Sequence, residues 1–66
     1  MESVRDYIKK YQDIVEYFIL QDTMGKEIKV SSEDAEFFID PNILDEHEVE
    51  YCQKNLLDEY CILYYA

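Results

Sequence analysis

The apolar positions near the start of the chain recur with the spacing of a helix. Within residues 2–12 they fall three or four positions apart, at Val4, Tyr7, Ile8 and Tyr11. Side chains at this spacing share one face of an α-helix. Ser3 directly precedes them and is a suitable N-cap. We therefore predict a helix over residues 2–12.

Residues 13–21 have a different pattern, in which Ile, Val, Tyr and Phe dominate. These residue types favour a β-strand. Both alternating faces would be largely apolar, so the strand would lie in the centre of a sheet or be covered by a second subunit. A continuation of the first helix remains the alternative, because short apolar runs are ambiguous.

A turn and a second strand follow. Residues 22–25, Asp-Thr-Met-Gly, contain the only glycine of the chain, which can adopt positive φ in a tight turn. Glu27–Ser31 then alternates, with Ile28 and Val30 on one face. The sequence predicts a β-hairpin here.

Two helices are predicted in the middle of the chain. The first begins at Ser31-Ser32-Glu33-Asp34, where serine hydroxyls can cap backbone amides, and ends near Ile39. The second begins after Asp40 as its cap, with proline in the first helical position. We expect it to run from about Pro41 to Leu56, because Val49, Cys52 and Leu56 would share one face. Its opposite face would be the densest acidic patch in the chain.

Residues 59–65, EYCILYY, predict a last strand that is again apolar on both faces. The order of elements indicates a single α+β domain over residues 1–66, with a small antiparallel sheet of about three strands and short helices. So short a chain with two-faced strands favours a homodimer. Tyr60, Tyr64 and Tyr65 would lie in the core or in that dimer interface.

Acidic residues outnumber basic ones by 16 to 6, which gives a formal net charge of −10. No Lys or Arg occurs from Val30 to Gln53, a stretch that carries Glu33, Asp34, Glu36, Asp40, Asp45, Glu46, Glu48 and Glu50. Such a segment repels nucleic acid and anionic membranes. A basic protein surface is the expected partner.

The sequence offers no catalytic or cofactor motif. His47 is the only histidine and stands between Glu46 and Glu48, which do not face it on a helix. No phosphate-binding glycine loop or nucleophile motif is present. The spacing of His47, Cys52 and Cys61 does not match a zinc site. We therefore expect no enzymatic activity, no cofactor and no metal.

Cys52 and Cys61 are too few for a secreted disulfide scaffold. The first residues are amphipathic and charged, unlike a signal peptide, and no apolar run approaches the length of a membrane span. These features indicate a cytoplasmic protein with reduced thiols, although one disulfide between the two cysteines remains open.

The acidic stretch surrounds a pair of aromatic residues, Phe37 and Phe38. Carboxylates around an aromatic anchor can occupy a DNA-binding cleft, because the carboxylates stand where phosphates would and the aromatic ring engages an apolar feature. The alternative is a solvated helix face that only aids solubility. The candidate partner-binding residues are Glu33, Asp34, Glu36, Phe37, Phe38 and Asp40.

The hairpin and short helix resemble small phage-encoded inhibitors of uracil-DNA glycosylase, of the type found in phi29-like Bacillus phages. The resemblance covers roughly residues 13–40 and rests on Ile19-Leu20-Gln21-Asp22, Gly25-Lys26-Glu27 and residues 32–39, with residues 57–65 as the last strand. It implies an acidic dimeric DNA mimic. In this family a helix phenylalanine, here Phe37 or Phe38, helps to form a pocket for the DNA-intercalating apolar residue of the glycosylase. The N-terminal helix and the second acidic helix depart from the family pattern.

The sequence thus predicts a DNA-mimicking inhibitor of a host DNA-processing enzyme that acts in the host cytoplasm. The resemblance implies that this enzyme is a uracil-DNA glycosylase. Its aromatic pocket would be shared between two subunits. Two alternatives remain: an acidic regulatory module that binds another basic host protein, as anti-restriction, anti-CRISPR, toxin-regulating or polymerase-regulating proteins do, and a structural protein that assembles through its tyrosine-rich strands.

Overall fold

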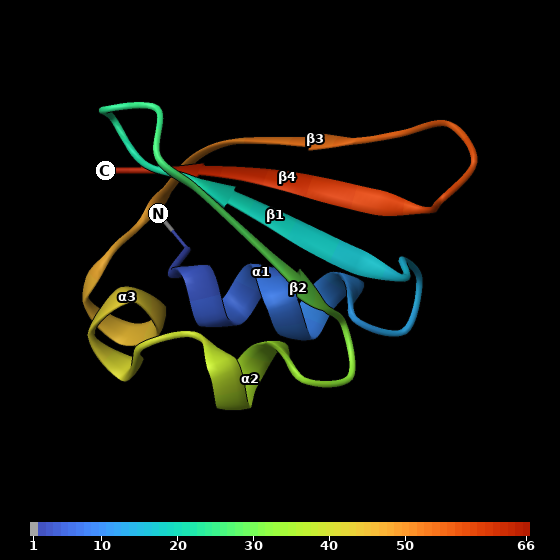
Figure 1. The fold of residues 1–66 in the computed structure, drawn as a ribbon, viewed down its shortest axis with the longest axis horizontal. Helices are drawn as coiled ribbons and strands as arrows, with labels where there is room; N and C mark the ends of the chain where they lie inside the picture. The colour runs from blue at the N-terminus through green and yellow to red at the C-terminus, as the bar shows by residue number, and fades with distance from the viewer. Residues whose placement is uncertain (1) are drawn as a thin grey trace.

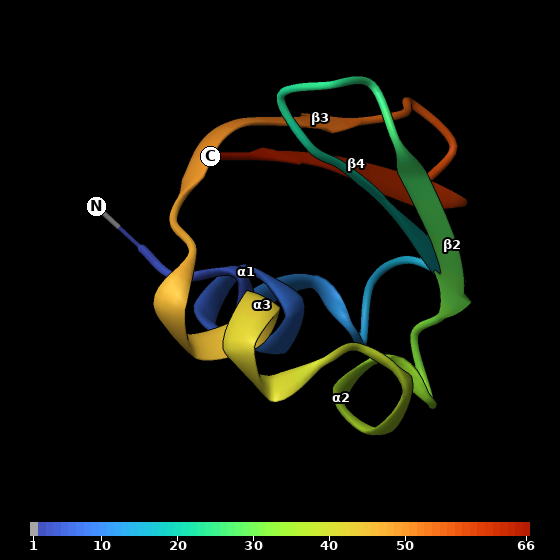
Figure 2. The same cartoon turned by 60° about the vertical axis from the view of Figure 1, so that its left-hand side comes forward.

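The computed structural model describes residues 2–66 as an α+β fold, with a four-stranded sheet and three helices (Figure 1). The elements are α1 (Val4–Tyr11), β1 (Tyr17–Gln21), β2 (Glu27–Ser31), α2 (Ala35–Phe38), α3 (Pro41–Glu46), β3 (Val49–Lys54) and β4 (Tyr60–Tyr65). The strand order is β2-β1-β4-β3. All three helices lie on the same side of the sheet (Figure 2).

Helix α1 confirms the first predicted helix. Ser3 accepts a hydrogen bond from the Asp6 amide, and the Asp6 carboxylate accepts one from the Ser3 amide. This reciprocal capping satisfies two backbone donors that a helix N-terminus leaves free. Val4 and Ile8, one helical turn apart, are fully buried against the sheet.

The predicted hairpin is also confirmed. Strand β1 begins at Tyr17, after a turn at residues 12–14, and pairs antiparallel with β2. In the connection, one carboxylate oxygen of Asp22 accepts hydrogen bonds from the amides of Met24 and Lys26 at 2.9 Å. Gly25 has a φ of 83°, a backbone conformation in which a side chain is disfavoured.

The sheet is mixed, so the prediction of a purely antiparallel sheet of about three strands is wrong. Strand β4 lies between β1 and β3, parallel to β1 and antiparallel to β3. A parallel pair needs a long connection, and here β2, α2, α3 and β3 all lie between β1 and β4. The central position expected for a strand with two apolar faces is confirmed for β1.

The predicted helix from Pro41 to Leu56 is correct only at its start. Asp40 caps α3 by accepting from the Asn42 amide at 2.9 Å, but the helix ends at Glu46 and is followed by β3. The pairing of β3 with β4 is irregular between Val49 and Tyr51. A bulge at this point places Val49 and Cys52 three positions apart on the same face of a strand, which imitates helical spacing.

The core lies between the helices and one face of the sheet. Phe18 and Leu20 of β1 and Leu63 of β4 are fully buried, together with Leu44 of α3. Full burial of such a side chain contributes about 1.5–3 kcal/mol. Tyr65 also belongs to this core, so one of the three C-terminal tyrosines is a core residue.

The opposite side of the sheet is covered by no helix of the part of the chain that the structure describes (Figures 1 and 2). Outward-facing side chains form rows across the strands, and we call their uncharged members the open face: Tyr17, Ile19, Gln21, Tyr51, Gln53, Tyr60, Ile62 and Tyr64. Tyr17 stacks on Tyr60 with ring centroids 5.5 Å apart. Tyr60 and Tyr64 therefore belong to this face rather than to the core.

Candidate functional site

Helix α2 is a single short turn that carries the aromatic pair. Its N-cap is Asp34, whose side chain makes no capping hydrogen bond to the helix and instead accepts from the Ser31 hydroxyl at 3.1 Å. The expected serine cap is therefore wrong. The Ser32 hydroxyl is buried and donates to the Val15 carbonyl at 2.6 Å, which ties the start of this segment to the connection between α1 and β1.

Both phenylalanines point away from the core. Phe37 is 88% exposed and Phe38 is 74% exposed, whereas Ala35 is the buried residue of α2. Large apolar side chains that remain exposed together are typical of a binding surface. The aromatic pair is therefore available to a partner, as the proposed site requires.

The four candidate carboxylates differ in their surroundings. Glu33, Asp34 and Asp40 are exposed, and Asp40 is held in place by its capping bond. Glu36 is half-buried, and one of its oxygens is buried with no hydrogen-bond partner among residues 2–66. Three of the four can therefore face a partner directly. We define the α2 surface as these acids with the aromatic pair: Glu33, Asp34, Glu36, Phe37, Phe38 and Asp40.

Arg5 of α1 neutralises part of the negative charge next to this surface. Its guanidinium donates to Asp45 of α3 through Nε at 2.6 Å and Nη2 at 3.0 Å. The hydrogen bonds from Arg5 hold the pKa of the Asp45 carboxyl below its usual value. The same bonds, with a smaller contribution from Glu36, raise the pKa of Arg5. Asp45 is thus engaged within the fold.

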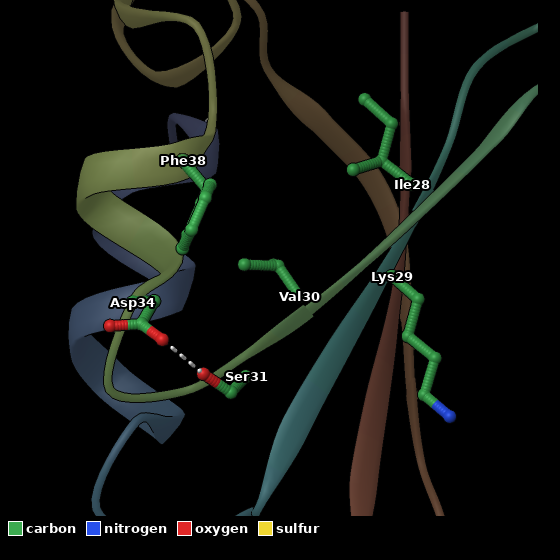
Figure 3. A pocket seen from close by; sticks show the side chains of 6 residues that line it. All are labelled: Ile28, Lys29, Val30, Ser31, Asp34 and Phe38. Atoms are coloured by element: carbon green, nitrogen blue, oxygen red, sulfur yellow. Dashed lines mark hydrogen bonds between the residues drawn. The ribbon is translucent and has the colours of Figure 1, made fainter.

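A cavity of about 320 Å³ separates α2 from the edge strand β2 (Figure 3). Its apolar wall is formed by Ile28 and Val30 from β2 and by Phe38 from α2, and Asp34 lies at one end. The Lys29 side chain points away from it (Figure 3). The cavity can accept a small apolar side chain, and the Asp34 carboxylate lies at its rim.

Sequence reasoning did not identify Ile28 and Val30 as part of the site. Their alternation predicted a strand with one apolar face, and both do face the helix layer. What could not be predicted is that β2 lies at the edge of the sheet, beside α2. This placement gives the aromatic pair an apolar neighbour and separates its two members, because only Phe38 lines the cavity.

The acids that follow the candidate site do not form one helical face, so the predicted acidic face is wrong. Asp45 and Glu46 belong to α3, whereas Glu48 makes a bridge with Ser3 and Glu50 lies in β3. The negative surface beside the aromatic pair is therefore smaller than the sequence suggested.

No group of three or more His, Cys, Asp or Glu residues within residues 2–66 could hold a metal ion. His47 directly follows α3 as its C-cap and is half-buried, with its ring edge-on to the Tyr65 ring at a centroid distance of 5.4 Å. None of the helices in this range is both long and apolar enough to cross a membrane.

Comparison with known proteins returns no matching family model, no matching curated protein and no matching solved structure.

Proposed function

We propose that this protein is a DNA-mimicking inhibitor that occupies the DNA-binding cleft of a host DNA-processing enzyme, with uracil-DNA glycosylase as the leading target. The observation that carries the proposal is the exposure of Phe37 and Phe38 among carboxylates, next to an apolar cavity. A chain of this charge offers no phosphate-binding surface of its own, so its natural counterpart is a surface that binds phosphates.

In this mechanism the exposed carboxylates take the places of DNA phosphates. Glu33, Asp34 and Asp40 accept hydrogen bonds from basic and amide groups of the cleft. Glu36 contributes mainly through its charge, because it is half-buried near Arg5. The carboxylates steer the two proteins together and select against neutral or acidic surfaces.

The aromatic part of the site supplies most of the binding energy. Phe38, Ile28 and Val30 line a cavity that suits an apolar side chain, such as the one a glycosylase inserts into DNA in the resembled family. Desolvated aromatic residues at the centre of an interface are typical hot spots. Phe37 packs against the cleft outside the cavity.

A glycosylase assay tests the proposal. Purified protein in excess should abolish release of uracil from a uracil-containing oligonucleotide, and added DNA should compete with the protein for the enzyme. Undiminished base excision at saturating protein would exclude this target, and the absence of competition by DNA would exclude mimicry.

A second candidate is an acidic regulatory module that binds a basic host protein without imitating DNA. The distribution of Asp45, Glu46, Glu48 and Glu50 over three different segments favours it, because these acids have no regular spacing along one element. Binding to a basic partner that DNA does not displace would support this candidate over the first.

A further inference from the structure

The open face combines partly exposed tyrosine and isoleucine side chains with a near absence of charge. The two central strands, β1 and β4, contain no charged residue, although a third of the chain is charged. Glu27 and Lys29 lie in the edge strand β2, and Glu50 lies at the irregular position of the other edge strand. The sixteen acids are thus kept away from the middle of this face.

The open-face tyrosines are arranged as an ordered layer. Tyr51 and Tyr64 have ring centroids 5.6 Å apart, and the Tyr17–Tyr60 pair is stacked. Ile19 and Ile62 lie opposite each other between these two pairs. Tyr51 nevertheless remains 60% exposed. Contacts within the layer half-bury most of these side chains but leave part of their apolar surface in water, and an exposed contiguous apolar patch is typical of an interaction surface.

Charge decides what can cover this surface. Tyrosines on a sheet can stack on nucleic acid bases, but Lys29 is the only basic residue among the outward-facing strand positions of residues 2–66, and its ammonium lies 4.4 Å above the Tyr17 ring. A net charge of −10 repels phosphates. A basic protein would find no carboxylates in the middle of the face to pair with. The occupant must itself be uncharged and apolar.

We propose that a second copy of this chain covers the open face, so that the protein is a face-to-face homodimer. A copy of the same face meets each requirement, and identical surfaces related by a two-fold axis are the commonest way in which proteins pair. Two sheets pack about 10 Å apart with their strands roughly aligned. The three helices of each subunit remain on the outer sides (Figure 2), where the acids of α2 and α3 are far from those of the other subunit.

The dimer geometry determines how many partner molecules the α2 surfaces can bind, and this step rests on the proposed function. The two α2 surfaces lie on opposite outer sides of the dimer, so each subunit holds one partner molecule by itself. A pocket shared between subunits, as the sequence suggested, is incompatible with this geometry. The expected complex contains two copies of this chain and two partner molecules.

Mass measurement in solution tests the dimer. Light scattering coupled to size-exclusion chromatography should give the wild-type protein a molar mass of twice that of one chain, which is 8.0 kDa. Ile62→Lys places a charge in the middle of the open face and should yield monomer, with at least a tenfold rise in the dimer dissociation constant. It also lowers the net negative charge, so reduced association could not be attributed to stronger repulsion. Leu56→Lys is the control, because Leu56 is 99% exposed in the β3–β4 turn, and it should remain dimeric.

A second variant distinguishes weaker dimerisation from misfolding of the subunit. Gln53 pairs with Ile62 across the strands and is already exposed, so Gln53→Lys should fold normally and also weaken the dimer. A wild-type monomer up to millimolar concentration, a larger assembly, or a folded Gln53→Lys variant that dimerises like wild type would overturn the proposal. If the wild-type protein is a dimer but does not inhibit the glycosylase, the result would contradict the proposed function and leave the dimer proposal intact.

Discussion

At the scale of single residues, neighbouring identical side chains have different surroundings. Phe37 and Phe38 are adjacent on α2, yet only Phe38 lines the cavity beside β2 (Figure 3). A single helical turn sends successive side chains in directions about 100° apart, so one ring faces the edge strand and the other faces solvent. The two residues should therefore contribute unequally to binding.

Replacing Phe38 by Ala should weaken binding to the partner enzyme by about 2–4 kcal/mol, as expected for a hot spot that fills an apolar pocket. Phe37→Ala should cost less. Because both rings are largely exposed in the free protein, neither change should lower the free energy of unfolding by more than about 1 kcal/mol. Titration calorimetry and thermal denaturation measure the two effects. A larger binding loss for Phe37→Ala would assign the anchor to that residue instead.

Cys52 and Cys61 are also poised for a chemical change, since their sulfur atoms lie 2.9 Å apart as free thiols on neighbouring strands. Burial raises the pKa of the Cys61 thiol, so the more accessible Cys52 should react first. Treatment with glutathione disulfide should form a Cys52–Cys61 disulfide, releasing two reduced glutathiones while the protein loses two hydrogens. Closing this short loop should add about 2–3 kcal/mol to stability.

Intact-mass analysis, thiol titration and a thermal melt check this outcome, and Cys52→Ser provides a variant that cannot form the bond. Two thiols that both remain titratable after prolonged exposure to the oxidant would show that the sheet does not allow the sulfur atoms to approach.

At the scale of elements, the helix layer is held together by a charged contact as well as by apolar packing. Arg5 joins α1 to Asp45 of α3, forty residues away along the chain, in a two-pronged ion pair. The planar guanidinium matches the carboxylate geometry. Because α3 directly follows the segment that carries the α2 surface, this contact helps to hold that segment against α1.

The Arg5–Asp45 ion pair should make stability depend on pH. The pKa of Asp45 is lower in the folded protein than in the unfolded chain, so its stabilising effect is present above the unfolded value and is lost as pH falls through the folded value. Asp45→Asn should lower the melting temperature slightly at neutral pH, and the difference from wild type should vanish in acid. The effect is expected to be small because the pair is exposed.

The neighbouring exposed acid provides the matched control. Glu46→Gln makes the same change in charge on the same helix, but no ion pair among residues 2–66 involves Glu46, so its melting temperature should not fall at neutral pH. Equal decreases for both variants would mean that net charge, rather than the ion pair, causes the effect.

At the scale of the whole molecule, the acids of the helices and the open face lie on two different sides. The helix side carries α2 and α3 with their acids, and the sheet side carries the open face (Figure 2). In the proposed dimer, this separation would bury the open face against a second copy and leave the negative groups of the helix side accessible to the proposed basic partner.

Association with the partner enzyme should accordingly depend on salt. Long-range attraction between opposite charges is screened beyond about 8–10 Å at physiological ionic strength. Raising the salt concentration well above this level should reduce the association rate constant by roughly tenfold or more, with a smaller change in the dissociation rate. Stopped-flow or surface-based kinetics measure both constants. An association rate that is independent of salt would contradict the role proposed for the carboxylates.

Much of the local structure could be predicted because short-range contacts determine it. Ser3 and Asp6 cap α1 from within one turn, Gly25 permits the hairpin turn, and Asp40 with Pro41 begins α3. The acidity of the chain follows directly from its composition, and so does the expectation that it does not bind nucleic acid.

Only the tertiary structure determined which strands pair, where the sheet ends and which residues meet at the site. The bulge in β3 gives Val49 and Cys52 a helical spacing, so no local pattern distinguishes that strand from a helix. The parallel pairing of β1 with β4 joins segments far apart along the chain. The cavity exists because edge strand β2 and helix α2 lie side by side, and such long-range contacts depend on how all the elements share one core.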